Sequence, residues 1–272
     1  MSAEQEDRSF IFRRIVPEGP IAPVTRELAD EMPIAIEFNG IGYAVLMATP
    51  ADIEELVLGF ALAERLIGRE DALLDVDVHA TGQGIIARAT LPEGRTEALL
   101  SRVRHRASES SCGICGLENL DQAIRPLPSV TASSMSDSQA VFRALGDLKG
   151  HQPLNARTGA AHAAALVAAD GTIRLTREDV GRHNAFDKLI GAMWQRGWAW
   201  DGGFALLSSR CSYELVEKAV LADCPLLVTI SAPTRLAAER AAGAGLALVA
   251  LARSDSILLY GEGALGLDKC GE

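Results

Sequence analysis

The sequence predicts an α/β protein with a small N-terminal α+β domain and a C-terminal three-layer α/β/α domain. In the C-terminal half, short continuous apolar runs alternate with amphipathic stretches, which indicates a largely parallel sheet covered on both faces. Asn39-Gly40 and Asp170-Gly171 each separate two apolar runs and predict hairpins. Residues 125–134 are rich in Pro, Ser and Thr, as a linker is. We therefore expect domains at 1–108 and 136–272, joined by 109–135.

The N-terminal domain is expected to begin with an extended, partly ordered lead-in over residues 1–30, because Pro17, Pro20 and Pro23 prevent a helix there. Thr49 is the expected cap of the single helix, and Gly68 its expected end. Strands and helix follow in the order ββαββ, a small α+β unit, at 33–38, 41–47, 51–67, 74–80 and 84–91.

Connecting helices are expected over 94–124, and a capping-box pattern at 136–139 opens a helix that runs to about Leu148. A loop and the second hairpin (163–168 and 172–175) come next. The remaining helices are expected at 182–196, 213–221 and 235–242. The remaining strands are expected at 204–207, 226–230, 246–251 and 257–260.

The composition is that of an ordinary globular protein of 272 residues, with 48% hydrophobic and 23% charged residues. Its net charge of −10 argues against a broad nucleic-acid or membrane surface. Apolar runs are too short to span a bilayer, and the polar, acidic N-terminus does not resemble a secretory signal. Five cysteines without framework spacing favour the reducing cytoplasm.

Cys112 and Cys115 form a CxxC pair with a glycine after each thiol. An arginine-rich run, 102–106, precedes the pair, and a stretch with helical spacing, 117–124, follows it. Cationic side chains and the N–H groups of a helix start both stabilise a thiolate, so the pKa of such a thiol falls below about 8.5. The pattern therefore predicts a reactive pair.

Other interpretations of the pair stay open at this point. A structural zinc site needs four ligands, and Cys211, Cys224 and Cys270 provide no second pair. A mixed Cys/His zinc site could use His105 or His183. A thioredoxin-type dithiol is expected early in a βαβ unit rather than in the middle of the chain.

Three turns at predicted strand ends carry hydroxyl groups and one arginine each: 208–212, 231–235 and 252–256. The first two lead directly into helices. Helix N-termini, hydroxyls and guanidinium groups together bind phosphate or another anion, and ligands of α/β sheets bind beyond the carboxyl ends of strands. For any single turn, a plain helix cap or a surface ion pair is an equally good interpretation.

A further polar cluster spans residues 177–188, where His183 and Asp187 have the i, i+4 spacing of one helix face. The carboxylate of Asp187 is therefore expected to orient the imidazole. A capped helix start with solvated charges is the structural alternative. Glu178 and Asp179 are adjacent and are not expected to face each other as an acid/base pair.

Several segments together resemble the FdhD family, sulfur carriers required for formate dehydrogenase activity. They are SCGICG at 111–116, REDVGRHN at 177–184, DKLIG at 187–191, ELVEKA at 214–219 and SAPT at 231–234. The resemblance covers nearly the whole chain from about Pro33. It implies a C-terminal domain that resembles the cytidine deaminase fold. The H-x-E and P-C-x-x-C ligands of a zinc deaminase are absent from the sequence, and no resident metal is expected.

The resemblance implies a sulfurtransferase that takes persulfide sulfur from a cysteine desulfurase and delivers it to the bis-molybdopterin guanine dinucleotide cofactor of formate dehydrogenase. Cys112 would carry the persulfide and Cys115 would assist. The cofactor, or a GDP-like nucleotide in its place, would contact Leu251, Ala252, Arg253, Ser254, Asp255 and Ser256, with His183, Arg210 and Ser231 as neighbours.

The resemblance also implies a homodimer, and it leaves open whether the metal is molybdenum or tungsten. Cys211 departs from the family pattern and is expected to add a redox-sensitive side chain to the pocket. Two other functions remain possible: a non-catalytic cofactor-binding chaperone, and a CxxC dithiol oxidoreductase.

Overall fold

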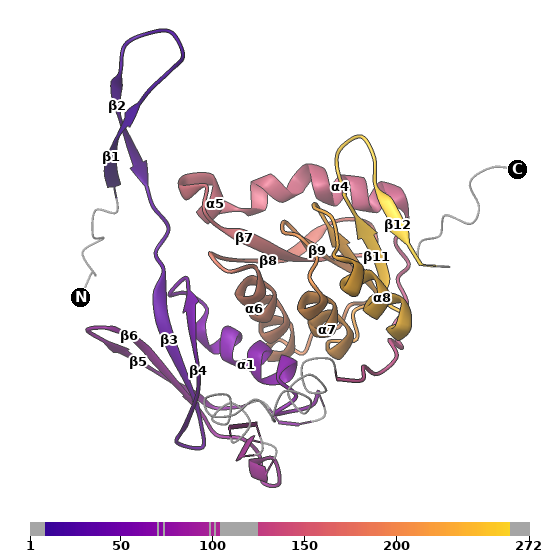
Figure 1. The fold of residues 1–272 in the computed structure, drawn as a ribbon. Helices are drawn as coiled ribbons and strands as arrows, with labels where there is room; N and C mark the ends of the chain where they lie inside the picture. Colours follow the sequence, from indigo (N-terminus) through magenta and orange to yellow (C-terminus); the bar gives the residue numbers. More distant parts are fainter. Residues whose placement is uncertain are drawn as a thin grey trace, which may run out of the picture.

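The computed structural model describes residues 9–69, 71–72, 74–97, 99–100, 102–103 and 125–261. It confirms the α/β class: a four-stranded and a six-stranded sheet lie on opposite sides of a helical layer, and further helices cover the outer face of the larger sheet (Figure 1). Within the described ranges, no helix is both long and apolar enough to cross a membrane.

An antiparallel ribbon of β1 (Ser9–Arg14) and β2 (Ala22–Glu27) extends away from the body of the protein (Figure 1). The expected extended backbone is confirmed for these residues, and their pairing into a ribbon is an addition that the sequence did not predict. The prolines do exclude a helix, as predicted, but Pro23 fits within a two-stranded ribbon because an edge strand does not need every N–H. Apolar side chains such as Ile11, which is 79% exposed, remain uncovered on the ribbon.

The N-terminal unit has the predicted ββαββ order. Its elements are β3 (Met32–Phe38), β4 (Ile41–Ala48), α1 (Ile53–Ala63), β5 (Val76–Thr81) and β6 (Gly84–Ala89). The sheet order is β4-β3-β6-β5, in which β3 and β6 run parallel. Alternate β3 side chains, Ile34, Ile36 and Phe38, are fully buried beneath α1.

Helix α1 is shorter than predicted, and Thr49 does not cap it. The N-cap is Asp52, in the left-handed region at φ 53°, without a side-chain capping bond. Thr49 instead accepts a hydrogen bond from the Val180 amide at 3.2 Å and donates its own N–H to Asp179 at 3.0 Å. A residue that looks like a local cap therefore joins two distant parts of the chain.

The C-terminal sheet has the order β12-β11-β10-β9-β7-β8. Its strands are β7 (His162–Val167), β8 (Ile173–Asp179), β9 (Phe204–Leu207), β10 (Leu226–Thr229), β11 (Ala247–Ala250) and β12 (Leu258–Tyr260). The expectation of a largely parallel sheet is wrong, because three of its five pairings are antiparallel. Parallel pairing is confined to β9-β10-β11, where helices supply the crossovers. The turns before β8 and β12 are too short for a crossover.

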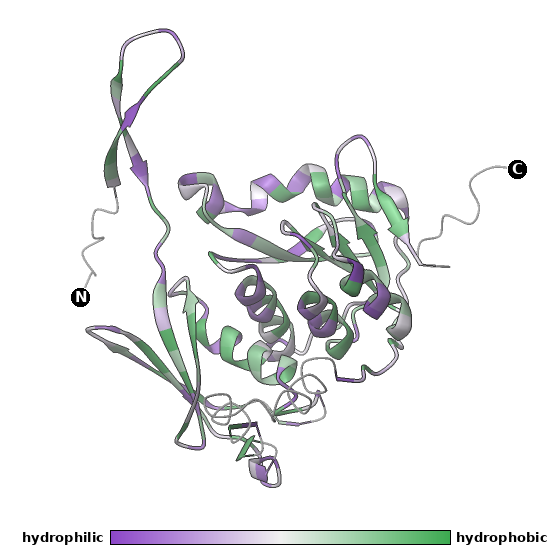
Figure 2. Cartoon of the chain, viewed as in Figure 1, coloured by the Kyte–Doolittle hydropathy of each residue, from purple (hydrophilic) through white to green (hydrophobic). Residues whose placement is uncertain are grey.

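Helices cover both faces of this sheet, as predicted. They are α4 (Ser138–Leu148), α5 (Pro153–Thr158), α6 (Arg182–Gln195), α7 (Tyr213–Leu221) and α8 (Arg235–Ala244), with a 3-10 turn η1 (Lys149–His151) before α5. A loop is predicted from the sequence in place of α5, and that prediction is wrong for Pro153–Thr158. Ala165 and Val167 of β7 face α4, whereas Ala164 and Leu166 face the other helices. Figure 2 shows the apolar strands between helices of mixed polarity.

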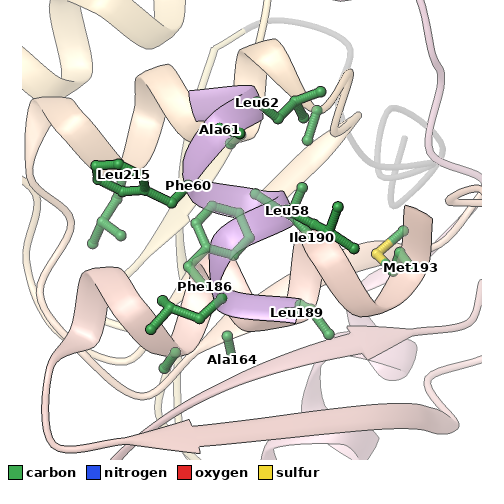
Figure 3. Close-up of a cluster of buried hydrophobic side chains, with 14 of the residues drawn as sticks. Leu58, Phe60, Ala61, Leu62, Ala164, Phe186, Leu189, Ile190, Met193 and Leu215 are labelled. Atoms are coloured by element: carbon green, nitrogen blue, oxygen red, sulfur yellow. The ribbon is translucent and has the colours of Figure 1, made fainter. Parts of the chain in front are cut away.

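Helix α1 packs directly on α6, so one buried cluster contains side chains from both expected domains (Figure 3). Two glycines permit the close crossing. A Cβ atom at Gly59 would lie 1.9 Å from the Asp187 carbonyl oxygen, and one at Gly191 would lie 1.9 Å from that of Glu55. The division at residues 108 and 136 stays a prediction, as does the likeness to cytidine deaminase.

Candidate functional site

Three strand-end turns meet at one edge of the C-terminal sheet. Strand β7 is antiparallel to both β8 and β9, so β8, β9, β10 and β11 all end at this edge. The Cys211 amide donates to the Ala232 carbonyl at 3.3 Å, and the Leu251 amide donates to the Ser231 carbonyl at 3.3 Å. The structure therefore brings the turns with Arg210, Ser231 and residues 251–256 side by side.

The segment Leu251–Ser256 leaves β11 in a sharp turn. Leu251 has a left-handed backbone (φ 48°), and Ala252 is buried, with its amide donating to the Thr229 carbonyl at 3.1 Å. The four residues that follow are exposed: Arg253, Ser254, Asp255 and Ser256. The Arg253 amide closes the turn on the Ser256 carbonyl at 2.9 Å. The segment thus presents polar groups at the sheet edge, and the buried Ala252 holds it in place.

Two helix starts at this edge differ in what their hydroxyls do. Thr234 accepts a hydrogen bond from the Ala237 amide at 3.2 Å, so it is an ordinary cap of α8. Ser212, the N-cap of α7, makes no such bond, and its buried hydroxyl has no protein partner. Arg210, two residues before Ser212, is exposed. The plain-cap interpretation therefore fits the turn at 231–235 and does not account for the turn at 208–212.

His183 lies in the first turn of α6, but its partner differs from the prediction. Its Nε2 atom is 3.2 Å from Glu214 on α7, whereas both oxygens of Asp187 bind Lys218, at 2.6 and 2.8 Å. The expectation that Asp187 orients the imidazole is therefore wrong. Burial, with the charges of Lys218 and Arg182, lowers the pKa of His183 to about 3, so the imidazole is neutral. The 3.2 Å contact of its Nε2 atom with Glu214 is therefore not an ion pair.

Burial also raises the pKa of Asp187, to about 6, although Lys218 opposes the shift. The positions of the two residues in α6 explain why Asp187 binds Lys218 while His183 contacts Glu214. Asp187 lies one turn deeper than His183 and faces α7, where the Lys218 ammonium reaches it. The i, i+4 spacing places two side chains on one face but does not decide which of them a neighbouring helix contacts.

The rest of the polar cluster is a buried joint. Asp179 and Lys188 are both fully buried and lie 2.6 Å apart. Lys188 also donates to the Thr49 carbonyl at 2.9 Å, and Asn184 donates to Asp179 at 3.0 Å and to the Met47 carbonyl at 2.8 Å. These bonds fix the start of α6 to the end of β4. The interpretation as solvated charges is wrong for these three side chains.

Glu178 faces away from this joint and accepts the amides of Leu154 and Asn155, both at 2.8 Å, at the start of α5. As expected, it forms no acid/base pair with Asp179.

His162 is a residue of this edge that sequence reasoning missed. It begins β7 and lies opposite Asp179 in the register. Burial and the charge of Arg182 lower the pKa of His162, and Asp179 partly offsets them. Because β7 runs against its neighbours, its first residue reaches the edge where they end. The strand was predicted to begin one residue later, at Ala163. The residues of β7 do not indicate in which direction the strand runs relative to β9.

Cys112 and Cys115 lie outside the described residues, as do Cys270 and His105. Cys211 and Cys224 are fully buried free thiols, and burial raises the pKa of each to about 12. Cys224 packs as a small apolar residue, as predicted. Cys211 lies beneath its turn as a protonated thiol, which contradicts the expectation of a redox-sensitive side chain in the pocket. The described residues contain no group of three His, Cys, Asp or Glu side chains placed to hold a metal.

The sequence similarity of the chain extends over nearly its whole length. The model of the FdhD/NarQ family matches residues 29–264. The chain belongs to the FdhD/NarQ family. It is 43% identical over 242 residues to a sulfur carrier protein FdhD of Xanthomonas euvesicatoria, covering 89% of this chain and 86% of the relative. It is 41% identical over 246 residues to the protein of that name from Chromobacterium violaceum, covering 89% and 91%.

The FdhD/NarQ fold is also that of a solved structure. A crystal structure of a candidate formate dehydrogenase accessory protein from Desulfotalea psychrophila superposes with a TM-score of 0.70 at 20% identity. The match covers 94% of this chain and 99% of that one. The arrangement of sheets and helices is therefore common to distant sequences.

Proposed function

We propose that this FdhD/NarQ protein is a sulfur carrier that activates formate dehydrogenase. It takes persulfide sulfur from a cysteine desulfurase onto Cys112 and delivers it to the bis-molybdopterin guanine dinucleotide cofactor. The observation that carries the proposal is the 43% identity, over 89% of the chain, to a protein named sulfur carrier protein FdhD. The CxxC pair and the polar sheet edge supply chemistry that fits this role.

Sulfur uptake needs only a thiolate and a persulfide donor. The Cys112 thiolate attacks the terminal sulfur of the desulfurase persulfide, and the sulfur–sulfur bond of the donor breaks. The donor cysteine leaves as a thiolate, and the new bond on Cys112 is again a persulfide, so no external oxidant is consumed. Cys115 would release the remaining sulfur or protect it during transfer.

The cofactor is the substrate of this reaction, and its nucleotide ends carry several negative charges. The turn with Leu251–Ser256 and the neighbouring Arg210 and Ser231 offer backbone amides, hydroxyls and guanidinium groups for them. The unpartnered Ser212 hydroxyl lies at the same edge. A neutral His183 would donate a hydrogen bond rather than a charge. This site is also where a GDP-like nucleotide would bind.

The role requires free thiols, which belong in a reducing cytoplasm. A homodimer and complexes with the desulfurase and the dehydrogenase are part of the proposal.

Mass spectrometry of Cys112 tests the transfer directly. After incubation with a cysteine desulfurase and cysteine, we expect the Cys112 peptide to gain one sulfur atom, and the gain to be absent in Cys112→Ala. If activation of formate dehydrogenase survives in Cys112→Ala cells, the chain is a cofactor-binding chaperone. A reversible Cys112–Cys115 disulfide without sulfur gain indicates a dithiol oxidoreductase.

A further inference from the structure

The ribbon of β1 and β2 has one face that is mainly apolar and open to solvent. In its antiparallel register Phe12 stands opposite Val24 and Phe10 opposite Arg26, and alternation along each strand puts these four side chains on one face. Phe10 is 53% exposed and Phe12 is 44% exposed. The ribbon extends away from the body (Figure 1), and within the described residues its two strands pair only with each other.

A ribbon of this kind is expected to need a second layer. An isolated two-stranded hairpin is marginally stable in water, because neither of its faces is buried. The body holds this ribbon at its base, where Glu27 pairs with Arg157 of α5 at 3.1 Å. Another molecule that packs on the face with the two phenylalanines would supply the missing burial.

The four-stranded sheet of the N-terminal unit also has an open apolar face. The buried side chains of β3 point toward α1, so the residues between them, Pro33 and Ala35, point to the outer face. In the register, Met47 lies opposite Pro33, Val45 lies opposite Ala35, and Ile86 lies on the other side of Ala35. Val45 is 66% exposed and Met47 is 49% exposed, and α1 covers the opposite face (Figure 1). These five residues form an apolar band across β4, β3 and β6.

A second copy of the chain is the partner that fits both surfaces. Each copy carries one ribbon face and one outer sheet face, so a two-fold axis lets each ribbon lie on the sheet of the other copy and covers both surfaces at once. Permanent interfaces are also more hydrophobic than transient ones. A partner that binds only during sulfur uptake or delivery would leave both apolar surfaces exposed for the rest of the time.

The size of the contact favours this reciprocal arrangement. One ribbon face measures about 10 by 20 Å, because two strands lie about 4.8 Å apart and the six residues of each rise about 3.3 Å apiece. A single contact of this size is well below the roughly 800 Å² that each partner of a stable dimer buries. In the reciprocal dimer each copy buries a ribbon face and a sheet face, which doubles the area.

We propose that two copies of this chain form a two-fold dimer in which the ribbon of each copy lies on the outer face of the other copy's N-terminal sheet. The rings of Phe10 and Phe12 pack against the partner's Val45 and the partner's Met47. The inference deepens the proposed function, which includes a homodimer, by assigning the surface that joins the copies. It uses no residue of the cofactor site or of the CxxC pair.

The first experiment is sedimentation velocity of the full chain over a range of concentrations. Phe12→Lys and Val45→Lys each place a charge in both halves of the interface, so each should raise the dissociation constant of the dimer at least about a hundredfold. Unchanged circular dichroism would show that each variant is folded.

Two matched controls place the same charge on other exposed strand residues. Thr25→Lys lies on the opposite face of the same ribbon, and Leu258→Lys lies on β12 of the other sheet, where the side chain is 56% exposed. Both should leave the dissociation constant within about threefold of that of the unchanged chain, because an exposed substitution outside the interface has a small effect.

The second experiment maps the contact without disrupting it, and it serves if a lysine variant does not fold. Phe12 is replaced by p-benzoylphenylalanine, which keeps an aromatic ring, and unlabelled protein is mixed with an equal amount of protein labelled with heavy nitrogen before irradiation. Mass spectrometry should find the ribbon of one copy crosslinked to β4 or β6 of the other, in pairs of one light and one heavy peptide.

Several outcomes would overturn the proposal. They are a monomer at every concentration measured, a dimer that Phe12→Lys and Val45→Lys leave intact, a dimer that the controls dissociate equally, and crosslinks that join ribbon to ribbon or stay within one copy. Neither experiment involves sulfur. Absence of sulfur gain on Cys112 would therefore refute the sulfur-carrier function and leave this interface to be judged by itself.

Discussion

Replacement of Lys188 by methionine tests whether the buried joint holds the two halves of the fold together. Lys188 is fully buried, and its ammonium binds the Asp179 carboxylate at 2.6 Å and the Thr49 carbonyl at 2.9 Å. Methionine has a similar length and fills the same space without a charge. The substitution therefore leaves packing nearly unchanged and removes two polar interactions.

The loss in free energy of unfolding depends on the state of Asp179 after the ammonium of Lys188 is removed. Asp179 keeps its hydrogen bonds from Thr49, Gly181 and Asn184 but loses its counter-ion in a site without solvent. Removal of one partner from a buried ion pair costs about 3–5 kcal/mol. Since domains of this size are stable by only about 5–15 kcal/mol, the variant should unfold at a markedly lower denaturant concentration.

Urea unfolding followed by circular dichroism measures the effect. Arg88→Met breaks an exposed pair with Glu37 and should cost at most about 1 kcal/mol. The double variant Asp179→Asn, Lys188→Met removes the buried charge and should recover part of the loss. A change in Lys188→Met no larger than that of Arg88→Met would refute the assignment of this pair as the joint.

Three further predictions concern the helix crossing, acid stability and nucleotide binding. Gly59→Ala should destabilise the fold by about 1–3 kcal/mol or more, because its Cβ meets the Asp187 carbonyl. Gly243→Ala on α8, with open space around it, should stabilise the fold by up to about 1 kcal/mol. Both effects are measured from the midpoints of urea unfolding. The lowered pKa of His183 means that below pH 6.5 the unfolded chain takes up a proton that the folded chain does not. The free energy of unfolding should therefore fall toward pH 3 by at most about 1.4 kcal/mol per pH unit. His183→Asn should show a shallower fall when urea unfolding is measured over the same pH range. Arg253→Ala should weaken GDP binding about tenfold in calorimetry and leave sulfur gain on the carrier cysteine intact, and an unchanged affinity would remove this residue from the site.

Local signals were sufficient to predict most elements of the fold. Asn39-Gly40 and Asp170-Gly171 mark hairpins that the structure contains. The amphipathic and apolar runs from 182 to 250 gave helices and strands with boundaries close to those observed. The three strand-end turns also lie together, as expected, because consecutive parallel strands must end at one edge.

Long-range pairing decided the features that were missed. The direction of a hairpin in a sheet depends on which of its strands pairs with the neighbouring strand, so the antiparallel pairing of β7 with β9 could not be predicted from the residues of β7. The burial of Lys188 and the exchange of partners at His183 depend on residues about thirty or more positions away, Thr49 and Glu214. The β1-β2 ribbon lacks a buried face, so hydrophobic alternation gave no indication of it.

The polar cluster from 177 to 188 illustrates how structure separates binding residues from structural ones within a single segment. Asp179 accepts four hydrogen bonds, from the amides of Thr49 and Gly181 and the side chains of Asn184 and Lys188, which fills its acceptor sites. Both amide hydrogens of Asn184 are used as well. These groups have no capacity left for a ligand. Arg182, whose buried Nε has no partner, and the neutral His183 do have such capacity. In the proposed function, contact between this segment and a bound cofactor would therefore be made by these two residues at the helix start.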